Sequence, residues 1–102
     1  MKLETLVTRY RNLGYEPKGL DRDMEIDSII KWLYNTHDIF VSVIYCSIPF
    51  EHHKMFTGSY IYNTNKDYHN TFYCDKHFVN PFDAKFDAVR HLYRGLKFNF
   101  YR

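Results

Sequence analysis

The chain has few of the residues and segments that would assign it to a class directly. It has two cysteines, Cys46 and Cys74, and both lie in apolar stretches. This excludes a disulfide-stapled secreted scaffold and predicts reduced thiols in a cytosolic protein. No stretch approaches the roughly 18 apolar residues of a membrane span, and residues 1–17 lack the apolar segment of a signal peptide. We therefore expect a cytoplasmic protein with no membrane association.

Glycine and net charge are also scarce. The chain has four glycines, so a glycine-rich phosphate loop, a dinucleotide fingerprint and a Gly-x-Ser-x-Gly elbow are all absent. The net charge is only +2, but residues 39–102 carry a net +3 and five of the six histidines. This basic, aromatic-rich part is a candidate for contact with RNA or single-stranded DNA, although aromatics that fill the core and charges that solvate the surface are the favoured explanation.

Aromatic residues, in contrast, are abundant. They make up 20% of the chain, with ten tyrosines, nine phenylalanines and one tryptophan. A chain of 102 residues can bury a core of its own without a disulfide or metal. Together these features exclude a disordered protein and predict a single folded domain over residues 1–102.

Three segments have the three- and four-residue spacing of apolar side chains that predicts an amphipathic helix. They are residues 3–13, residues 21–38 and residues 81 to about 97. For the last helix, Asn80 is a good N-cap and Asp83 occupies the N3 position of a capping-box-like arrangement. The apolar face predicted for this helix consists of Phe82, Phe86, Val89, Tyr93 and Leu96.

Three segments between the second and third helices are rich in β-branched and aromatic residues and predict strands. They are residues 39–46, 54–63 and 71–74, joined by short polar connections. In the first strand the odd positions are expected to face the core: Ile39, Val41, Val43 and Tyr45. The predicted fold is therefore α+β, in the order α-α-β-β-β-α, with a small antiparallel three-stranded meander packed against helices.

Cysteines and histidines raise the question of a metal site. The weak candidate set is Cys46, His52, Cys74 and His77, of which the last two have a Cys-x-x-His spacing that occurs in zinc sites. The six-residue step from Cys46 to His52 is too long for a zinc knuckle. We therefore predict that the protein has no metal or other cofactor.

The histidines also suggest a small ribonuclease, because histidine titrates near neutral pH and serves as a general base. The candidate residues are Glu51, His52, His53, His91 and Arg94. The first three fall in the polar connection between two strands and the last two on the final helix, so convergence is not predicted. A further pair, His37 and Asp38, lies where the second helix ends, and there a histidine is explained by the helix dipole.

The second helix with its following strand, KWLYNTHDIFVSVIYC, and the final helix, NPFDAKFDAVRHLYRGL, resemble segments of small uncharacterised bacteriophage and prophage proteins. The resemblance spans most of the chain. The final helix differs in carrying Phe86, Arg90 and His91 where those proteins have small or acidic residues. The resemblance implies a phage-type accessory protein acting in a bacterial cytosol and directed at host proteins, including defence systems. It provides no catalytic residue to carry over.

Three hypotheses for the function follow. The first is a non-enzymatic protein-binding module, the second a nucleic-acid-binding protein that uses the basic C-terminal part, and the third a histidine-dependent ribonuclease. Aromatic residues and arginine commonly anchor interfaces, although for each of these residues taken singly packing in the core or the tail is the favoured explanation. The candidate binding residues are Trp32, Tyr60, Tyr62, Arg90, Arg94, Phe98, Phe100 and Tyr101.

Overall fold

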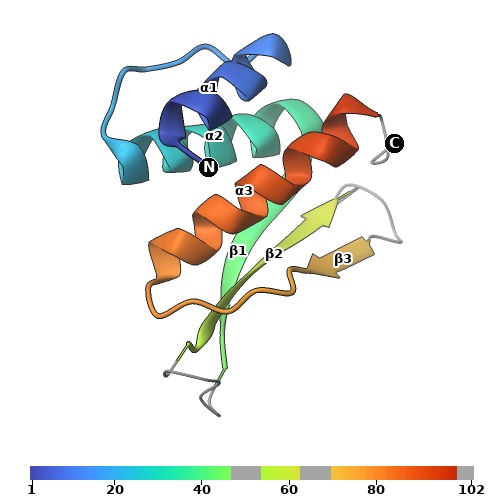
Figure 1. The fold of residues 1–102 in the computed structure, drawn as a ribbon. Coiled ribbons are helices and arrows are strands. Elements are labelled where there is room, and N and C mark those ends of the chain that lie inside the picture. The colour runs from blue at the N-terminus through green and yellow to red at the C-terminus, as the bar shows by residue number, and fades with distance from the viewer. Residues whose placement is uncertain (47–53, 63–69, 99–102) are drawn as a thin grey trace.

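The protein folds as one small α+β domain. The structure, a computed structural model, describes residues 1–46, 54–62 and 70–98 (Figure 1). It contains three helices and a three-stranded antiparallel sheet in the order α-α-β-β-β-α, which confirms the predicted fold class. The helices are α1 (Leu3–Asn12), α2 (Arg22–His37) and α3 (Pro81–Lys97). The strands are β1 (Ile39–Tyr45), β2 (Phe56–Tyr62) and β3 (Asn70–Tyr73).

The sheet is a meander in which β2 lies between β1 and β3. In the register, Tyr60 of β2 lies opposite Val41 on one side and Phe72 on the other. β2 begins two residues later than predicted, although the backbone N–H of Cys46 still donates to the carbonyl of Met55 at 2.8 Å. The ladder between β1 and β2 therefore continues one residue beyond the named strands.

All three helices lie on one side of the sheet, and α3 crosses it directly (Figure 1). The approach is close because β2 carries Gly58 under α3. A Cβ atom at this position would lie 2.6 Å from the carbonyl oxygen of Ala84 and 2.7 Å from the Cβ of Ala88. Small residues on both elements thus let helix and strand pack backbone to backbone.

The buried side of α3 differs from the prediction. Val89 is buried, and Phe86, Tyr93 and Leu96 pack partly buried against the core, but Phe82 is 37% exposed. The residues of α3 that are buried most fully are Ala84, Asp87, Ala88, Val89, Leu92 and Gly95. Because α3 is sandwiched between the sheet and the other helices, it buries two neighbouring sides rather than the single stripe expected.

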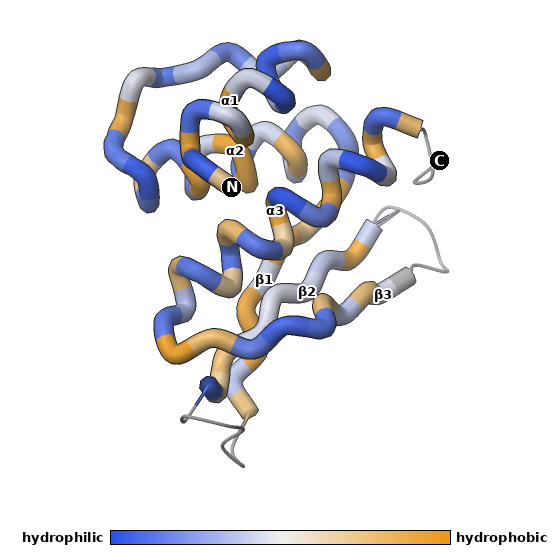
Figure 2. The backbone as a smooth tube through the Cα atoms, in the orientation of Figure 1, coloured by the Kyte–Doolittle hydropathy of each residue, from blue (hydrophilic) through white to orange (hydrophobic). Residues whose placement is uncertain are grey.

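The core is one continuous cluster that joins the helices to β1 and β2. Ile39 and Val41 are buried in it as predicted, whereas Tyr45 at the end of β1 is 58% exposed. Figure 2 shows hydrophobic and hydrophilic residues alternating along each helix, as expected where one side of the helix is buried. The predicted inward face of β1 therefore holds for its first half and fails where the strand extends past the helices.

Polar side chains fix the starts of two helices. The carboxylate of Asp21 accepts from the backbone N–H of Met24 at 3.1 Å, and the Asn80 side chain accepts from the N–H of Phe82 at 2.8 Å. Asn80 is therefore the N-cap of α3, as predicted. The Asp83 carboxylate pairs with the guanidinium of Arg22 at 2.7 Å, so it links α3 to α2.

A buried carboxylate holds the loop between α1 and α2. Glu25 is 3% exposed and accepts hydrogen bonds from the hydroxyl of Tyr15 and from the backbone N–H groups of Lys18 and Leu20. Burial acts to raise the pKa of Glu25, but these donors outweigh it and the pKa lies below its usual value. Burial, together with the hydrogen bond to Glu25, raises the pKa of Tyr15 to about 12. The loop is thus tied to α2 by a charged acceptor with three donors.

Candidate functional site

The sheet has one face that the helices do not cover. Gly58 faces α3, and the hydroxyls of Ser42 and Ser59 approach to 2.9 Å on the opposite side. Since side chains alternate along a strand, this fixes which residues point away from the helices. We call this surface the open face. The strand residues on this side are Phe40, Ser42, Ile44, Thr57, Ser59, Ile61, Thr71 and Tyr73. Thr57 and Ser59 on the central strand are buried, at 6% and 2% exposed, whereas Phe40, Thr71 and Tyr73 are exposed.

The open face is uncharged and partly aromatic. Phe40 is 48% exposed and Tyr73 is 59% exposed. Tyr34, at the end of α2, extends the surface, with its ring 6.4 Å from that of Phe40. None of the eight strand residues that define this face carries a charge. Exposed apolar patches of this kind mark interaction sites more often than ordinary surface.

The aromatics of the open face, Phe40 and Tyr73, were not among the predicted binding residues. Phe40 is an even-numbered residue of β1, and the prediction that odd positions face the core already implied that it points outward. The alternation of side chains along β1 therefore already indicated that Phe40 lies on the face away from the core. When a strand is apolar at both odd and even positions, both faces of the sheet at that strand are expected to be covered, one by the core and the other by a further contact.

Tyr60 was predicted as a contact residue and lies in the core instead. It is 1% exposed, and its ring stacks on that of Phe72 with centroids 5.0 Å apart. Its hydroxyl lies 3.1 Å from Nδ1 of His91 on α3. Tyr60 faces the helices because it shares the inward side of β2 with Gly58, so a partner cannot reach its ring. Tyr62 is partly buried against the same core.

The other predicted aromatic contacts are dispersed. Trp32 is partly buried, with its ring 6.1 Å from Tyr10 and 5.9 Å from Tyr15. Phe98 is 56% exposed just beyond α3. Phe100 and Tyr101 lie outside the described residues. The described aromatics of the prediction therefore form no single surface.

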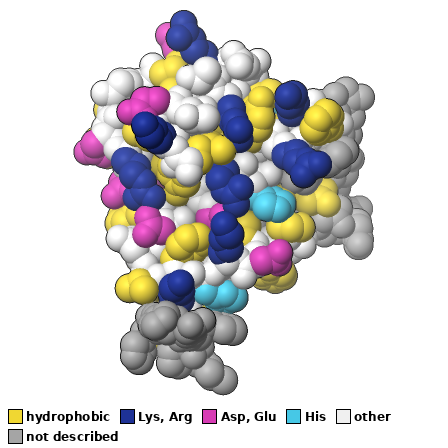
Figure 3. All heavy atoms as spheres, viewed as in Figure 1, with side chains coloured by type: hydrophobic (Ala, Val, Ile, Leu, Met, Phe, Trp, Pro, Cys, Tyr) yellow, Lys and Arg dark blue, Asp and Glu magenta, His cyan; other side chains and the backbone are white. Residues whose placement is uncertain are grey.

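Arg90 and Arg94 lie on α3 with Lys97, four and three residues apart, and so share one side of the helix. We call Arg90, His91, Arg94 and Lys97 the basic strip. Arg90 is partly neutralised, because it pairs at 2.8 Å with Asp87, which is 5% exposed. Figure 3 shows this side of the molecule, on which Lys and Arg side chains are interspersed with acidic ones.

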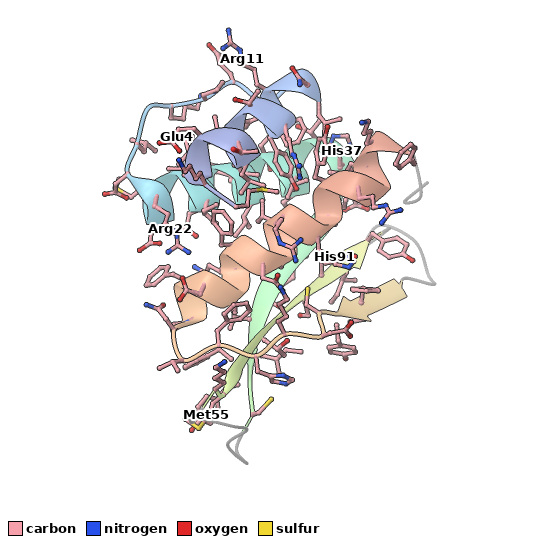
Figure 4. The ribbon with its side chains drawn as sticks, in the orientation of Figure 1. Glu4, Arg11, Arg22, His37, Met55 and His91 are labelled. Carbon is pink, nitrogen blue, oxygen red and sulfur yellow. The ribbon has the colours of Figure 1, made fainter. Side chains whose placement is uncertain are left out.

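His91 adjoins the aromatics beneath the basic strip. Figure 4 shows it projecting from α3 toward β2 and β3. Its ring centroid is 4.8 Å from that of Phe72, which is 38% exposed. Of the ribonuclease candidates, Glu51, His52 and His53 lie outside the described residues, so the structure brings only His91 and Arg94 onto one helix.

The candidate metal ligands are separated by the strand register. Cys46 pairs with Met55 on one side of β2, and the N–H of Cys74 donates to Gly58 on the other side. Met55 and Gly58 are three residues apart, or about 10 Å along the strand at 3.3 Å per residue. Zinc ligands lie within about 2.3 Å of a shared ion, so the two thiols cannot bind one metal.

The other properties of the candidate ligands also give no support to a metal site. Burial raises the pKa of the Cys74 thiol to about 12, which favours the unreactive protonated form. His77 is described and partly buried, whereas His52 is outside the described residues. Among residues 1–46, 54–62 and 70–98, no three His, Cys, Asp or Glu side chains gather into a metal-binding group.

His37 and Asp38 form the junction between α2 and β1. Asp38 is the C-cap of α2 in the left-handed conformation, with φ of 56°, and turns the chain into the sheet. Partial burial lowers the pKa of His37, whose ring lies 4.9 Å from Trp32. The sequence explained His37 by the helix dipole, which favours a charged imidazole, whereas burial beside Trp32 favours the neutral form. Packing therefore accounts for His37 better than the dipole does, and Asp38 has a structural role as the C-cap.

Comparisons with known proteins identify no relative. No protein-family model matches the chain, and neither a curated protein nor a solved structure is significantly similar to it. The resemblance to small phage proteins consequently stays a prediction. None of the three helices in the described part of the chain has the length and apolar character needed to cross a membrane.

Proposed function

We propose that the protein is a non-enzymatic binding module that engages a protein partner through the open face. The observation that supports this most strongly is the exposure of Phe40 and Tyr73 on a strand surface without charge. Aromatic side chains supply large contact area at low entropy cost and commonly form the hot spots of interfaces. The absence of charge from these strand positions favours an apolar protein surface over a nucleic acid as the occupant.

The resemblance to phage proteins directs the search for the partner. If the chain is phage-encoded, the partner is a protein of the bacterial host, and blocking that protein is the activity. The open face suits such a role because a contact through it leaves the core of the domain unchanged.

The first prediction tests the open face. We expect Phe40→Glu to weaken binding of the partner at least tenfold, because a hot-spot loss of about 2 kcal/mol corresponds to more than a factor of ten. The measurement is comparative capture from bacterial lysate by wild type and variant with quantitative mass spectrometry, followed by titration of the purified partner. Met24→Glu is the matched control, since Met24 is 55% exposed at the start of α2. A partner captured equally by all three proteins would show that the open face is not the interface.

A second candidate function is nucleic-acid binding by the basic strip. It is favoured by the exposed Phe72 ring beside His91, since single-stranded nucleic acids are bound by stacking platforms next to cations. It ranks second because Asp87 neutralises Arg90. The ribonuclease hypothesis has no further support among the described residues.

The second prediction concerns this candidate. If the basic strip contacts phosphates, the affinity for a short single-stranded RNA falls with salt, and Arg94→Gln lowers the slope of log K against log salt by about 1. Lys85→Gln is the control, because it removes the same charge near the other end of α3. It should leave the slope of log K against log salt unchanged. Weak binding that is the same at low and high salt would rule this function out.

A further inference from the structure

A second surface with the features of a ligand site lies among the helices, away from the sheet. A pocket of about 470 Å³ opens between the loop after α1 and the side of α2. Its lining includes Tyr15, Lys18, Ser28, Lys31, Trp32 and Asn35. These residues combine an aromatic wall, two cations and two uncharged polar groups, and none of them belongs to the open face.

The wall of the pocket is held in place before any ligand arrives. The loop side is fixed by Glu25, which accepts from the Tyr15 hydroxyl and from the backbone N–H of Lys18. Trp32 is clamped edge to face against Tyr15, at an interplanar angle of 72°. Gly14, also in the lining, has no side chain, and a Cβ there would lie 4.0 Å from the six-membered ring of Trp32. Gly14 therefore adds no side chain to the pocket beside the Trp32 ring.

Charge decides which ligands suit the pocket. Lys18 and Lys31 contribute two positive charges, and Glu16 contributes one negative charge, so the lining has a net charge of +1. Among the described residues, neither lysine forms an ion pair. A cation would be repelled, whereas an anion would be attracted, and the Trp32 ring offers a surface for planar stacking.

We infer that this pocket binds a small planar aromatic molecule that carries a negative charge, with the ring against Trp32 and the anionic group between Lys18 and Lys31. A nucleoside monophosphate and an aryl carboxylate share this chemistry. Ser28 and Asn35 supply a hydroxyl and an amide for the polar edge of the ring. The inference is independent of the proposed protein-binding function.

The chain provides its own reporter for a test, because Trp32 is its single tryptophan. Selective excitation of tryptophan therefore reports on a residue that lines this pocket. The probes are AMP, adenosine, inorganic phosphate and benzoate. We expect AMP or benzoate to change the fluorescence saturably with a dissociation constant of about 1 mM or tighter, and adenosine and phosphate to bind at least about tenfold more weakly. The stronger of AMP and benzoate identifies the anionic group.

Substitutions of the two lysines test whether the fluorescence change arises from binding between them. Lys18→Gln and Lys31→Gln are each expected to weaken binding of the better probe about fivefold, since each removes a charge-assisted contact. Lys54→Gln, an exposed lysine just before β2, makes the same change in net charge outside the pocket and should leave binding unaltered. The inference is overturned if neither AMP nor benzoate gives a saturable signal, if adenosine or phosphate binds as tightly as the better of these two probes, or if all three variants weaken binding equally.

Discussion

Gly58→Ala is expected to destabilise the protein by about 3 kcal/mol, at the upper end of the usual range for overpacking. The entropy of the unfolded chain alone predicts the opposite sign, because replacing a glycine that has ordinary backbone angles with alanine commonly stabilises by about 0.4–1 kcal/mol. The added Cβ would lie 2.6 Å from the carbonyl oxygen of Ala84 and 2.7 Å from the Cβ of Ala88. Both obstacles belong to α3, so the whole helix would have to move away from the sheet.

The measurement is equilibrium unfolding of wild type and variant in urea. A double-mutant cycle with Ala88→Gly isolates the contact, since the second change removes one of the two obstacles. We expect the double variant to be more stable than additivity predicts by about 1 kcal/mol, within the usual range of coupling between contacting residues. Gly19→Ala serves as a control, because nothing lies within 4 Å of its Cβ position and only its φ of 68° opposes the change. A Gly58→Ala variant at least as stable as wild type would mean that α3 does not pack this closely on β2.

Gly58 also illustrates what the sequence did not reveal. The helices and strands were predictable because they depend on local spacing and caps, such as Asn80 before Pro81. The second buried side of α3 was not, because Ala84 and Ala88 give a weak hydropathy signal. Their burial depends on a glycine about 30 residues away in the chain, and a pattern within the helix carries no information about it.

The candidate site shows the same division between local and long-range information. Tyr60 and Phe40 are both aromatic residues in strands, and composition alone assigns neither to the core or the surface. Tyr60 is 1% exposed on the side of the sheet that the helices cover, and Phe40 is 48% exposed on the other side. The alternation within β1 predicts that Phe40 points to the opposite face of the sheet from Ile39 and Val41. Which side of β2 carries Tyr60 is decided only by the pairing of the strands.

Glu25→Gln is the other substitution expected to have a large effect, a loss of about 2–3 kcal/mol at neutral pH. The carboxylate accepts from Tyr15, Lys18 and Leu20 in a buried position, and hydrogen bonds to charged groups contribute about 1.5–3 kcal/mol. The amide of glutamine replaces one acceptor oxygen with a donor, so at least one buried N–H or O–H loses its partner. For a domain of this size, the loss corresponds to a fall in Tm of roughly 10 °C or more.

The pH dependence of this loss identifies the charge as its source. The pKa of Glu25 in the folded protein lies below its usual value of 4.5. The contribution of Glu25 to stability is therefore fully present above pH 4.5 and disappears as the pH falls through the folded pKa. The difference in stability between wild type and Glu25→Gln should therefore be largest at neutral pH and should narrow on acidification below about 4.5. Urea unfolding at a series of pH values measures this difference.

Tyr15→Phe provides the matched comparison for Glu25→Gln. It removes one of the three donors and keeps the ring, so it should cost about 1–2 kcal/mol at neutral pH. The pKa of Tyr15 is raised from 10 to about 12 in the folded protein, so its contribution is present below pH 10 and is lost as the pH rises toward 12. Because the Tyr15 hydroxyl donates to the Glu25 carboxylate, the Tyr15→Phe difference should also narrow when Glu25 is protonated, and the loss toward pH 12 is the part that belongs to the Tyr15 hydroxyl itself. If the Glu25→Gln difference stayed constant from neutral to acidic pH, the loop would be held by packing rather than by the buried carboxylate.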